Sequence, residues 1–156
     1  MRLGFRVNRK KVAYAAVKHR NLEMLKLVFD VSLLSFSETR NILTLVVEKG
    51  FLDGLRYIHE VYKLQQMEHF TLIRVATELW NNHIVEYLLD HFDTEPRQGF
   101  VDAMYSMACA NDNIEVLDML YEKGLKPSHY MYLPLNSDEV SRWVNETPMV
   151  LIPWVK

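Results

Sequence analysis

The chain has 156 residues, of which 49% are hydrophobic and 24% charged, and its formal net charge is -2. This much apolar surface excludes an intrinsically disordered chain, and five Gly with five Pro are too few for a loop-rich all-β protein. The length fits one compact domain or one short array of repeats. One cysteine and no long apolar stretch predict a cytoplasmic or otherwise intracellular protein without a signal peptide or membrane span.

The first 22 residues are basic, with seven Lys or Arg and no acid. The rest of the chain holds 11 basic and 20 acidic residues, so a basic head precedes an acidic body. Such a head can neutralise phosphates, but it offers only Phe5 and Tyr14 for stacking on bases. We favour a solvated N-terminal segment, residues 1–10, over one that binds nucleic acid or an acidic surface. The basic residues of the head are Arg2, Arg6, Arg9, Lys10, Lys11, Lys18 and Arg20.

Four nine-residue segments align without gaps, and their starts are 30, 30 and 32 residues apart. In every segment the fourth and seventh columns are apolar, the fifth is charged and the ninth is acidic. Apolar positions around a single charged one predict a helix that is buried on most of its circumference. The segments are Leu22 to Asp30, Leu52 to Glu60, Asn82 to Asp90 and Ile114 to Glu122.

A first helix is predicted before each of these segments. Six residues upstream of each segment stand Ala16, Val46, Ala76 and Ala108, and a small residue in a recurring position lets two helices approach closely. Gly and Asn between the helices tolerate the left-handed backbone that closes a helix. Each repeat is therefore predicted as a helix, a tight turn, a longer helix and a loop, and repeats of this kind must stack to bury their apolar faces. The predicted repeats are 11–32, 41–62, 71–92 and 102–124.

The stretch from Ala108 to Gly124 resembles an ankyrin repeat, with small residues before an Asn-rich turn, then an acid, apolar pairs and a final Gly. Ala15 to Asp30 and Val46 to Glu60 are weaker matches, and the family's Thr-Pro-Leu-His start is absent. The resemblance covers residues 11–126 and implies an all-α, ankyrin-like helical solenoid of about four helix-turn-helix repeats. The period is shorter than the usual 33 residues, and the missing residues are those that build the family's β-hairpin fingers. Shortened units like these are similar to repeats in large DNA viruses and some protists.

Residues 127–156 are predicted to close the stack. Asn136 with Glu139 resembles an N-cap pair, which indicates a helix over 137–146. The tail from Met149 to Val155 is apolar, and we favour a cap in which it covers the last repeat. Docking or homodimerisation through this tail is the alternative.

No catalytic, cofactor or metal site is predicted. Cys109 shares a column with Val17, Val47 and Thr77, so a packing role is favoured over a nucleophile. The six histidines form no H-x-x-x-H pair, and one cysteine excludes a cysteine-based zinc site. The chain also has no phosphate-binding glycine loop and no G-x-S-x-G sequence. We therefore expect no enzyme activity and no cofactor.

The favoured function is a protein-protein interaction module, an adaptor or an inhibitor. The resemblance implies partner contacts at the ends of the first helices and in the turns. Trp80 and Phe51 stand out there, since a solvated turn usually takes polar residues; Trp80 is equally well explained by folding inward to fill the gap left by Asn82, and for Phe51 a core position is favoured. The candidate partner-binding residues are His19, Arg20, Lys49, Phe51, Leu79, Trp80, Asn81, Asn111 and Asp112.

Overall fold

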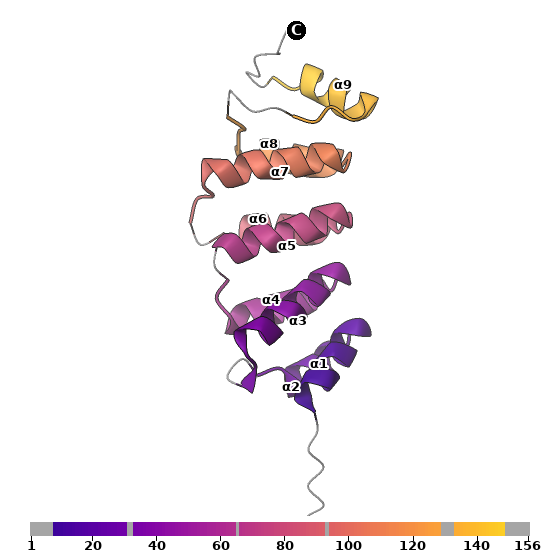
Figure 1. The fold of residues 1–156 in the computed structure, drawn as a ribbon, viewed down its shortest axis with the longest axis vertical. Helices are drawn as coiled ribbons and strands as arrows, with labels where there is room; N and C mark the ends of the chain where they lie inside the picture. The colour runs from indigo at the N-terminus through magenta and orange to yellow at the C-terminus, as the bar shows by residue number, and fades with distance from the viewer. Residues whose placement is uncertain (1–7, 31–32, 65, 93, 129–132, 149–156) are drawn as a thin grey trace, which may run out of the picture. The chain divides into compact units, whose positions relative to one another are not determined.

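The chain is all-helical throughout the part that the structure describes, as the repeat pattern predicts (Figure 1). It divides into two compact units, an N-terminal unit (Met1–Leu64) and a C-terminal unit (Gln65–Lys156). No strand occurs in the described ranges, so these ranges contain no β-hairpin finger. The computed structural model describes residues 8–30, 33–64, 66–92, 94–128 and 133–148.

The N-terminal unit consists of two helix pairs, namely α1 (Arg9–Lys18) with α2 (Leu22–Val28), and α3 (Phe36–Glu48) with α4 (Leu52–Val61). The first helices, α1 and α3, pack against each other, and so do the second helices, α2 and α4. Each pair also packs internally. The two pairs are therefore stacked, with the first helices in one layer and the second helices in the other.

The C-terminal unit repeats this arrangement and adds a final helix. Its elements are α5 (Gln66–Glu78), α6 (Asn82–Asp90), α7 (Gln98–Ala110), α8 (Ile114–Glu122) and α9 (Asp138–Glu146). Here α5 packs on α7, α6 packs on α8, and α9 lies against α8 (Figure 1). A helix is thus present within the predicted range 137–146 and contacts the last pair, and its capping role stays a prediction.

The second helices match the predicted segments closely, but the first helices differ from the prediction. The second helices α2, α4, α6 and α8 begin at the first column of the alignment, yet they have only 7, 10, 9 and 9 residues. The first helices have 10, 13, 13 and 13 residues, so the prediction of a longer second helix is wrong. The predicted repeat starts at 41, 71 and 102 fall inside α3, α5 and α7.

The first turn of α3 explains part of this difference, because it is polar and lies outside the apolar columns. The side chain of Ser35 accepts a hydrogen bond from the Glu38 N–H, and the Glu38 carboxylate accepts one from the Ser35 N–H at 2.9 Å. That bond from Ser35, followed by the one from Lys10, lowers the pKa of Glu38. The Ser35 to Glu38 capping box was readable in the sequence and places the helix start at Phe36.

The apolar columns form the core of both units. The small residues Ala16, Val46, Ala76 and Ala108 are fully buried, and so is every residue of the fourth column. The charged fifth column is exposed in all four pairs. Burial therefore follows the columns read from the sequence, as expected for helices packed on several sides.

The turn inside each pair has one repeated geometry. In the first turn, Arg20 N–H donates to the Val17 carbonyl and the next N–H donates to Ala16, which closes the helix in a Schellman-type motif. Each turn has one residue with positive φ, and we expected this residue to be Gly or Asn. Only one of the four, Gly50, meets that expectation. Asn21 and Asn113 instead cap the following helices, accepting from Met24 N–H and Val116 N–H. The positive-φ residues of the four turns are Arg20 (51°), Gly50 (59°), Trp80 (58°) and Asp112 (53°).

The C-terminal helix α9 is held by an N-cap and by one aromatic side chain. Ser137, and not Asn136, is the N-cap, because its hydroxyl accepts from the Val140 N–H at 3.1 Å. Trp143 is 9% exposed, and its Nε1–H donates to the Asp118 carboxylate of α8 at 2.6 Å. The apolar tail from Met149 to Val155 lies outside the described residues, so its covering role stays a prediction.

Gly54 of α4 lies under the ring of Phe51, which occupies the N-cap position of the same helix and is 5% exposed. A Cβ at Gly54 would stand 2.6 Å from Phe51 Cδ1, closer than real side chains approach. Gly99, in the first turn of α7, has no atom within 4 Å of such a Cβ. Only the first of these two helical glycines is therefore required by packing.

We expect Gly54→Ala to destabilise the protein by about 1–2 kcal/mol, because the buried ring must move out of its site. Gly99→Ala, the matched control, is expected to stabilise it by about 0.5 kcal/mol through the higher helix propensity of Ala. Urea unfolding of the full chain, followed by circular dichroism, measures both. A stabilising Gly54→Ala would contradict the packing of Phe51.

Candidate functional site

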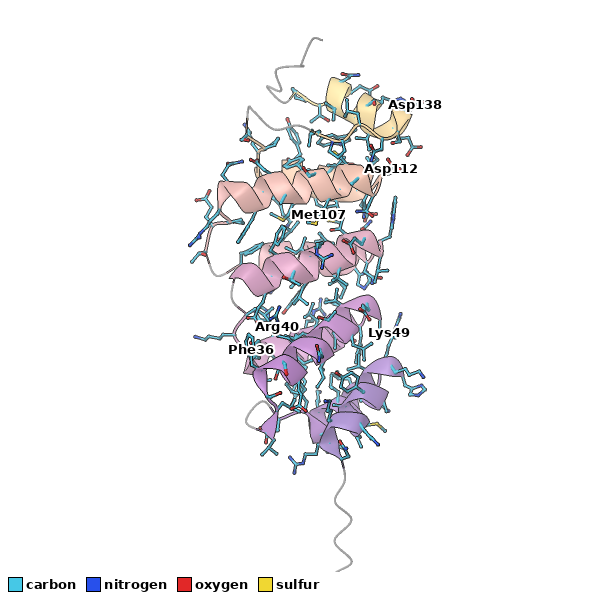
Figure 2. All side chains as sticks on the ribbon, in the orientation of Figure 1. Phe36, Arg40, Lys49, Met107, Asp112 and Asp138 are labelled. Atoms are coloured by element: carbon cyan, nitrogen blue, oxygen red, sulfur yellow. The ribbon has the colours of Figure 1, made fainter. Side chains whose placement is uncertain are left out.

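Eight of the nine predicted contact residues are accessible, and they lie in the turns at the ends of the first helices. His19, Arg20, Lys49, Leu79 and Trp80 are exposed, whereas Asn81, Asn111 and Asp112 are half-buried. Figure 2 shows Lys49 just past the end of α3 and Asp112 just past the end of α7. Phe51 is the exception. It belongs to the core, so the core interpretation applies and Phe51 is withdrawn as a contact residue.

Trp80 does not fold inward. Its side chain is 54% exposed, and that of its neighbour Leu79 is 51% exposed. The apolar position that Trp80 was considered to fill is occupied by Asn82 itself, which is only 7% exposed. The inward interpretation of Trp80 is therefore wrong, and Asn82 must satisfy its own polar atoms in the core.

A hydrogen-bonded group of side chains satisfies Asn82. Its amide donates to the Glu115 carboxylate at 2.8 Å, and its carbonyl accepts from the Asn113 amide at 2.8 Å. The Asn113 amide also lies 3.3 Å from the Thr77 carbonyl oxygen, and Asn113 is fully buried. Sequence analysis missed this network; its signal was the pair of Asn residues at equivalent ends of neighbouring repeats, Asn82 and Asn113.

The network joins the α5–α6 turn to the α7–α8 turn. The Thr77 carbonyl accepts from the Trp80 N–H at 3.2 Å as well as from the Asn113 side chain. The two turns therefore share the Thr77 carbonyl as a hydrogen-bond acceptor. This shared acceptor ties the backbone that carries Trp80 to the neighbouring turn. We call the accessible residues of these two turns the Trp80 surface. It consists of Leu79, Trp80, Asn81, Asn111 and Asp112.

Comparison with known proteins gives no match for this chain. No family model, curated protein or solved structure matches the chain. The assignment of a family and of a function therefore has to come from the residues themselves.

The lone cysteine and the side chains that can bind metals are the candidate groups for chemistry. Cys109 is fully buried, and burial, followed by the nearby Asp112, raises the pKa of its thiol to about 12, so the thiolate needed for attack is not formed near neutral pH. Among the described residues, no group of three or more His, Cys, Asp or Glu side chains is placed to hold a metal ion. No helix in those ranges is long and apolar enough to cross a membrane.

A shallow hollow of about 400 Å³ lies in the N-terminal unit and was not anticipated. Leu27, 83% exposed, and Val61, 50% exposed, contribute apolar surface to it. Its residues come from α1, from α2 and the segment after it, and from the end of α4, so only folding brings them together. The lining residues are Arg9, Lys26, Leu27, Phe29, Asp30 and Val61.

The basic head is only partly described. Arg9 and Lys10 belong to α1 and not to a separate segment, and the Lys10 ammonium lies 3.2 Å from the Glu38 carboxylate of α3. Arg2 and Arg6 lie outside the described residues. Lys10 is thus engaged within the N-terminal unit, which reduces the charge that the head offers to a phosphate.

Proposed function

We propose that this chain is a degenerate ankyrin-like repeat protein that acts by binding another protein through the Trp80 surface, as an adaptor or an inhibitor and without catalysis. The observation that carries the proposal is an exposed tryptophan in a left-handed turn position. The recurring columns and the four equivalent turns support the repeat assignment. They do not depend on the family name.

Local stability does not account for Trp80. A residue with a Cβ pays about 1–2 kcal/mol in the left-handed region, and an aromatic residue is rare there. The equivalent turn of the second pair has Gly50, which carries no such cost. Trp80 is not a core residue either, since it is 54% exposed. A residue that is unfavourable in its position and does not fill the core is best explained by a contact outside the chain.

The surroundings of Trp80 are typical of a binding hot spot. Trp is the residue type most enriched among interface residues that contribute about 2 kcal/mol or more. Leu79 beside it adds apolar surface, and the polar Asn111 and Asp112 are placed at the rim. Because the hydrogen bonds to the Thr77 carbonyl hold the turns in place, little conformational freedom is lost on binding.

The variant Trp80→Gly is expected to separate binding from stability. Gly adopts positive φ freely, so we expect the free energy of unfolding to rise by about 0.5–1 kcal/mol. Affinity for the partner is expected to fall at least about 30-fold, because a central aromatic anchor is lost. Affinity capture with wild-type protein identifies the partner, and titration of that purified partner against both proteins measures the loss.

Arg20→Gly provides the matched stability control, since Arg20 occupies the same turn position with φ 51°. It is expected to gain a similar stability. Unchanged affinity in Trp80→Gly would disprove the proposal. So would a loss of several kcal/mol of stability, because it would make Trp80 a structural residue.

A further inference from the structure

We propose, on the basis of the function above, that the Trp80 surface binds a basic segment of the partner, one that places Arg or Lys beside an apolar residue. The proposal goes further than a site for an unspecified protein, because it fixes the charge of the ligand. It rests on the charges of the C-terminal unit and on the charged groups next to Trp80.

The two units carry opposite charge. Residues 65–156 contain 14 Asp or Glu and six Lys or Arg, whereas residues 1–64 contain 12 basic and six acidic residues. The near-neutral total therefore hides a C-terminal unit of net charge -8. A surface on such a unit attracts cationic segments over several ångströms and repels nucleic acid and acidic peptides.

The charged residues next to Trp80 in the sequence and in the neighbouring α7–α8 turn are mostly acidic. Glu78 precedes the turn, but Arg74 lies 2.9 Å from its carboxylate and balances it. Asp112 and Glu115 belong to the neighbouring turn and the first turn of α8, and neither forms an ion pair with a described residue. Asp112 Oδ1 is buried and accepts no hydrogen bond from the described residues, whereas the exposed Glu115 accepts one from the neutral Asn82 amide. Two acidic residues that form no ion pair with a described residue thus belong to the turn next to that of Trp80 and to the start of α8, and Glu115 is the exposed one.

An arginine fits this combination better than any other side chain. Its guanidinium stacks on an indole face, a contact that stabilises by about 0.5–2 kcal/mol, and its N–H groups pair with carboxylates. An apolar residue next to that arginine would pack on Leu79. Lysine pairs with the carboxylates as a point charge and stacks less well.

Three synthetic peptides test the inference. They share the same Leu residues and carry Arg, Gln or Glu at the positions between them. Binding to the 156-residue chain is measured by fluorescence anisotropy at about 50 and about 200 mM salt. We expect the Arg peptide to bind at least about tenfold more tightly than the Glu peptide, with an affinity that falls as salt rises. Trp80→Gly is expected to abolish this binding.

Charge-matched variants locate the effect. Asp112→Asn with Glu115→Gln is expected to weaken the Arg peptide by about three- to tenfold. Glu139→Gln with Glu146→Gln removes the same charge from the exposed face of α9 and is expected to leave affinity unchanged. Thermal unfolding of both double variants shows whether the fold is retained.

The outcomes separate this inference from the proposed function. Equal affinity for the Arg and Glu peptides, or no binding by any of the three, overturns the basic-segment inference, while the partner titration with Trp80→Gly still judges the binding function. Tight binding of the Arg peptide that survives Trp80→Gly overturns the basic-segment inference, because the peptide then binds elsewhere, and the partner titration again judges the proposed function. Salt-dependent self-association of the protein without peptide would show that the basic N-terminal unit of a second copy is the occupant, and would replace the proposed partner.

Discussion

Asn113→Ala is expected to lower the free energy of unfolding of the C-terminal unit by about 3 kcal/mol. The substitution removes three interactions at once. The Val116 N–H loses its N-cap acceptor, the Asn82 carbonyl loses its donor, and the Thr77 carbonyl keeps only the Trp80 N–H. Because Asn113 is fully buried, the groups that it leaves behind have no other hydrogen-bond partner at hand.

Asn21→Ala is the matched control. Asn21 occupies the equivalent turn position in the first pair and caps α2 through the Met24 N–H at 3.0 Å, but its side chain is exposed. We expect it to cost about 1 kcal/mol, the usual contribution of an N-cap. The difference between the two variants measures the buried part of the network.

Hydrogen exchange of the 156-residue chain measures both effects, since it reports the opening of each unit separately. For a unit of this size, 1 kcal/mol corresponds to about 4–8 °C in Tm, so Asn113→Ala should lower the melting temperature of the C-terminal unit by at least about 12 °C. A double-mutant cycle with Asn82→Ala should give a coupling above about 0.5 kcal/mol. If Asn113→Ala costs no more than Asn21→Ala, the buried network does not stabilise the fold.

Trp143→Ala is expected to cost about 3 kcal/mol and to release α9 from the end of the C-terminal unit. The ring packs near the buried Tyr105, with centroids 6.3 Å apart, and its Nε1–H bonds to Asp118. Removing the indole takes away both of these contacts, and Val140 is then the buried residue that remains in α9. The apolar surface of α8 is then exposed to water, which favours aggregation.

Trp143→Phe separates packing from hydrogen bonding in this cap. It retains a ring next to Tyr105 and loses only the bond to Asp118, so we expect a cost of about 1 kcal/mol. Sedimentation and unfolding of both variants test the prediction. Full stability of Trp143→Ala would show that α9 does not cap the unit, and the predicted role of residues 127–156 would fail.

The periodic apolar columns were sufficient to predict the helix pairs. Leu25, Leu55 and Leu117 are each followed by a charged residue, and a position that is apolar in each repeat is predicted to lie in the core. The starts of the second helices followed correctly for the same reason. The first turns of the first helices lie outside the core, so their ends had to be read from caps such as Ser35 with Glu38, a weaker and more local signal.

The sequence could not show which residue of each turn has positive φ. A shift of one position along the chain exchanges the residue that ends one helix for the N-cap of the next. The prediction gave the left-handed position to Gly and Asn on propensity alone. In the folded chain Arg20, Trp80 and Asp112 accept this position, because the hydrogen bonds of the following helix and the packing of its first residues fix the register. Tertiary packing outweighs a conformational preference of about 1–2 kcal/mol.

By itself, the sequence determined the all-helical class, the two-helix repeat and the exposed charged column, because periodicity dictates which face of a helix is buried. Only the tertiary structure decided that Phe51 points inward and Trp80 outward, and that Asn82 is buried among polar partners. The burial of Asn82 depends on a contact between residues 31 positions apart, the bond from Asn113, whereas Phe51 packs against Gly54 of its own helix. Pattern along the chain carries no information on such a contact until the helices are packed against each other.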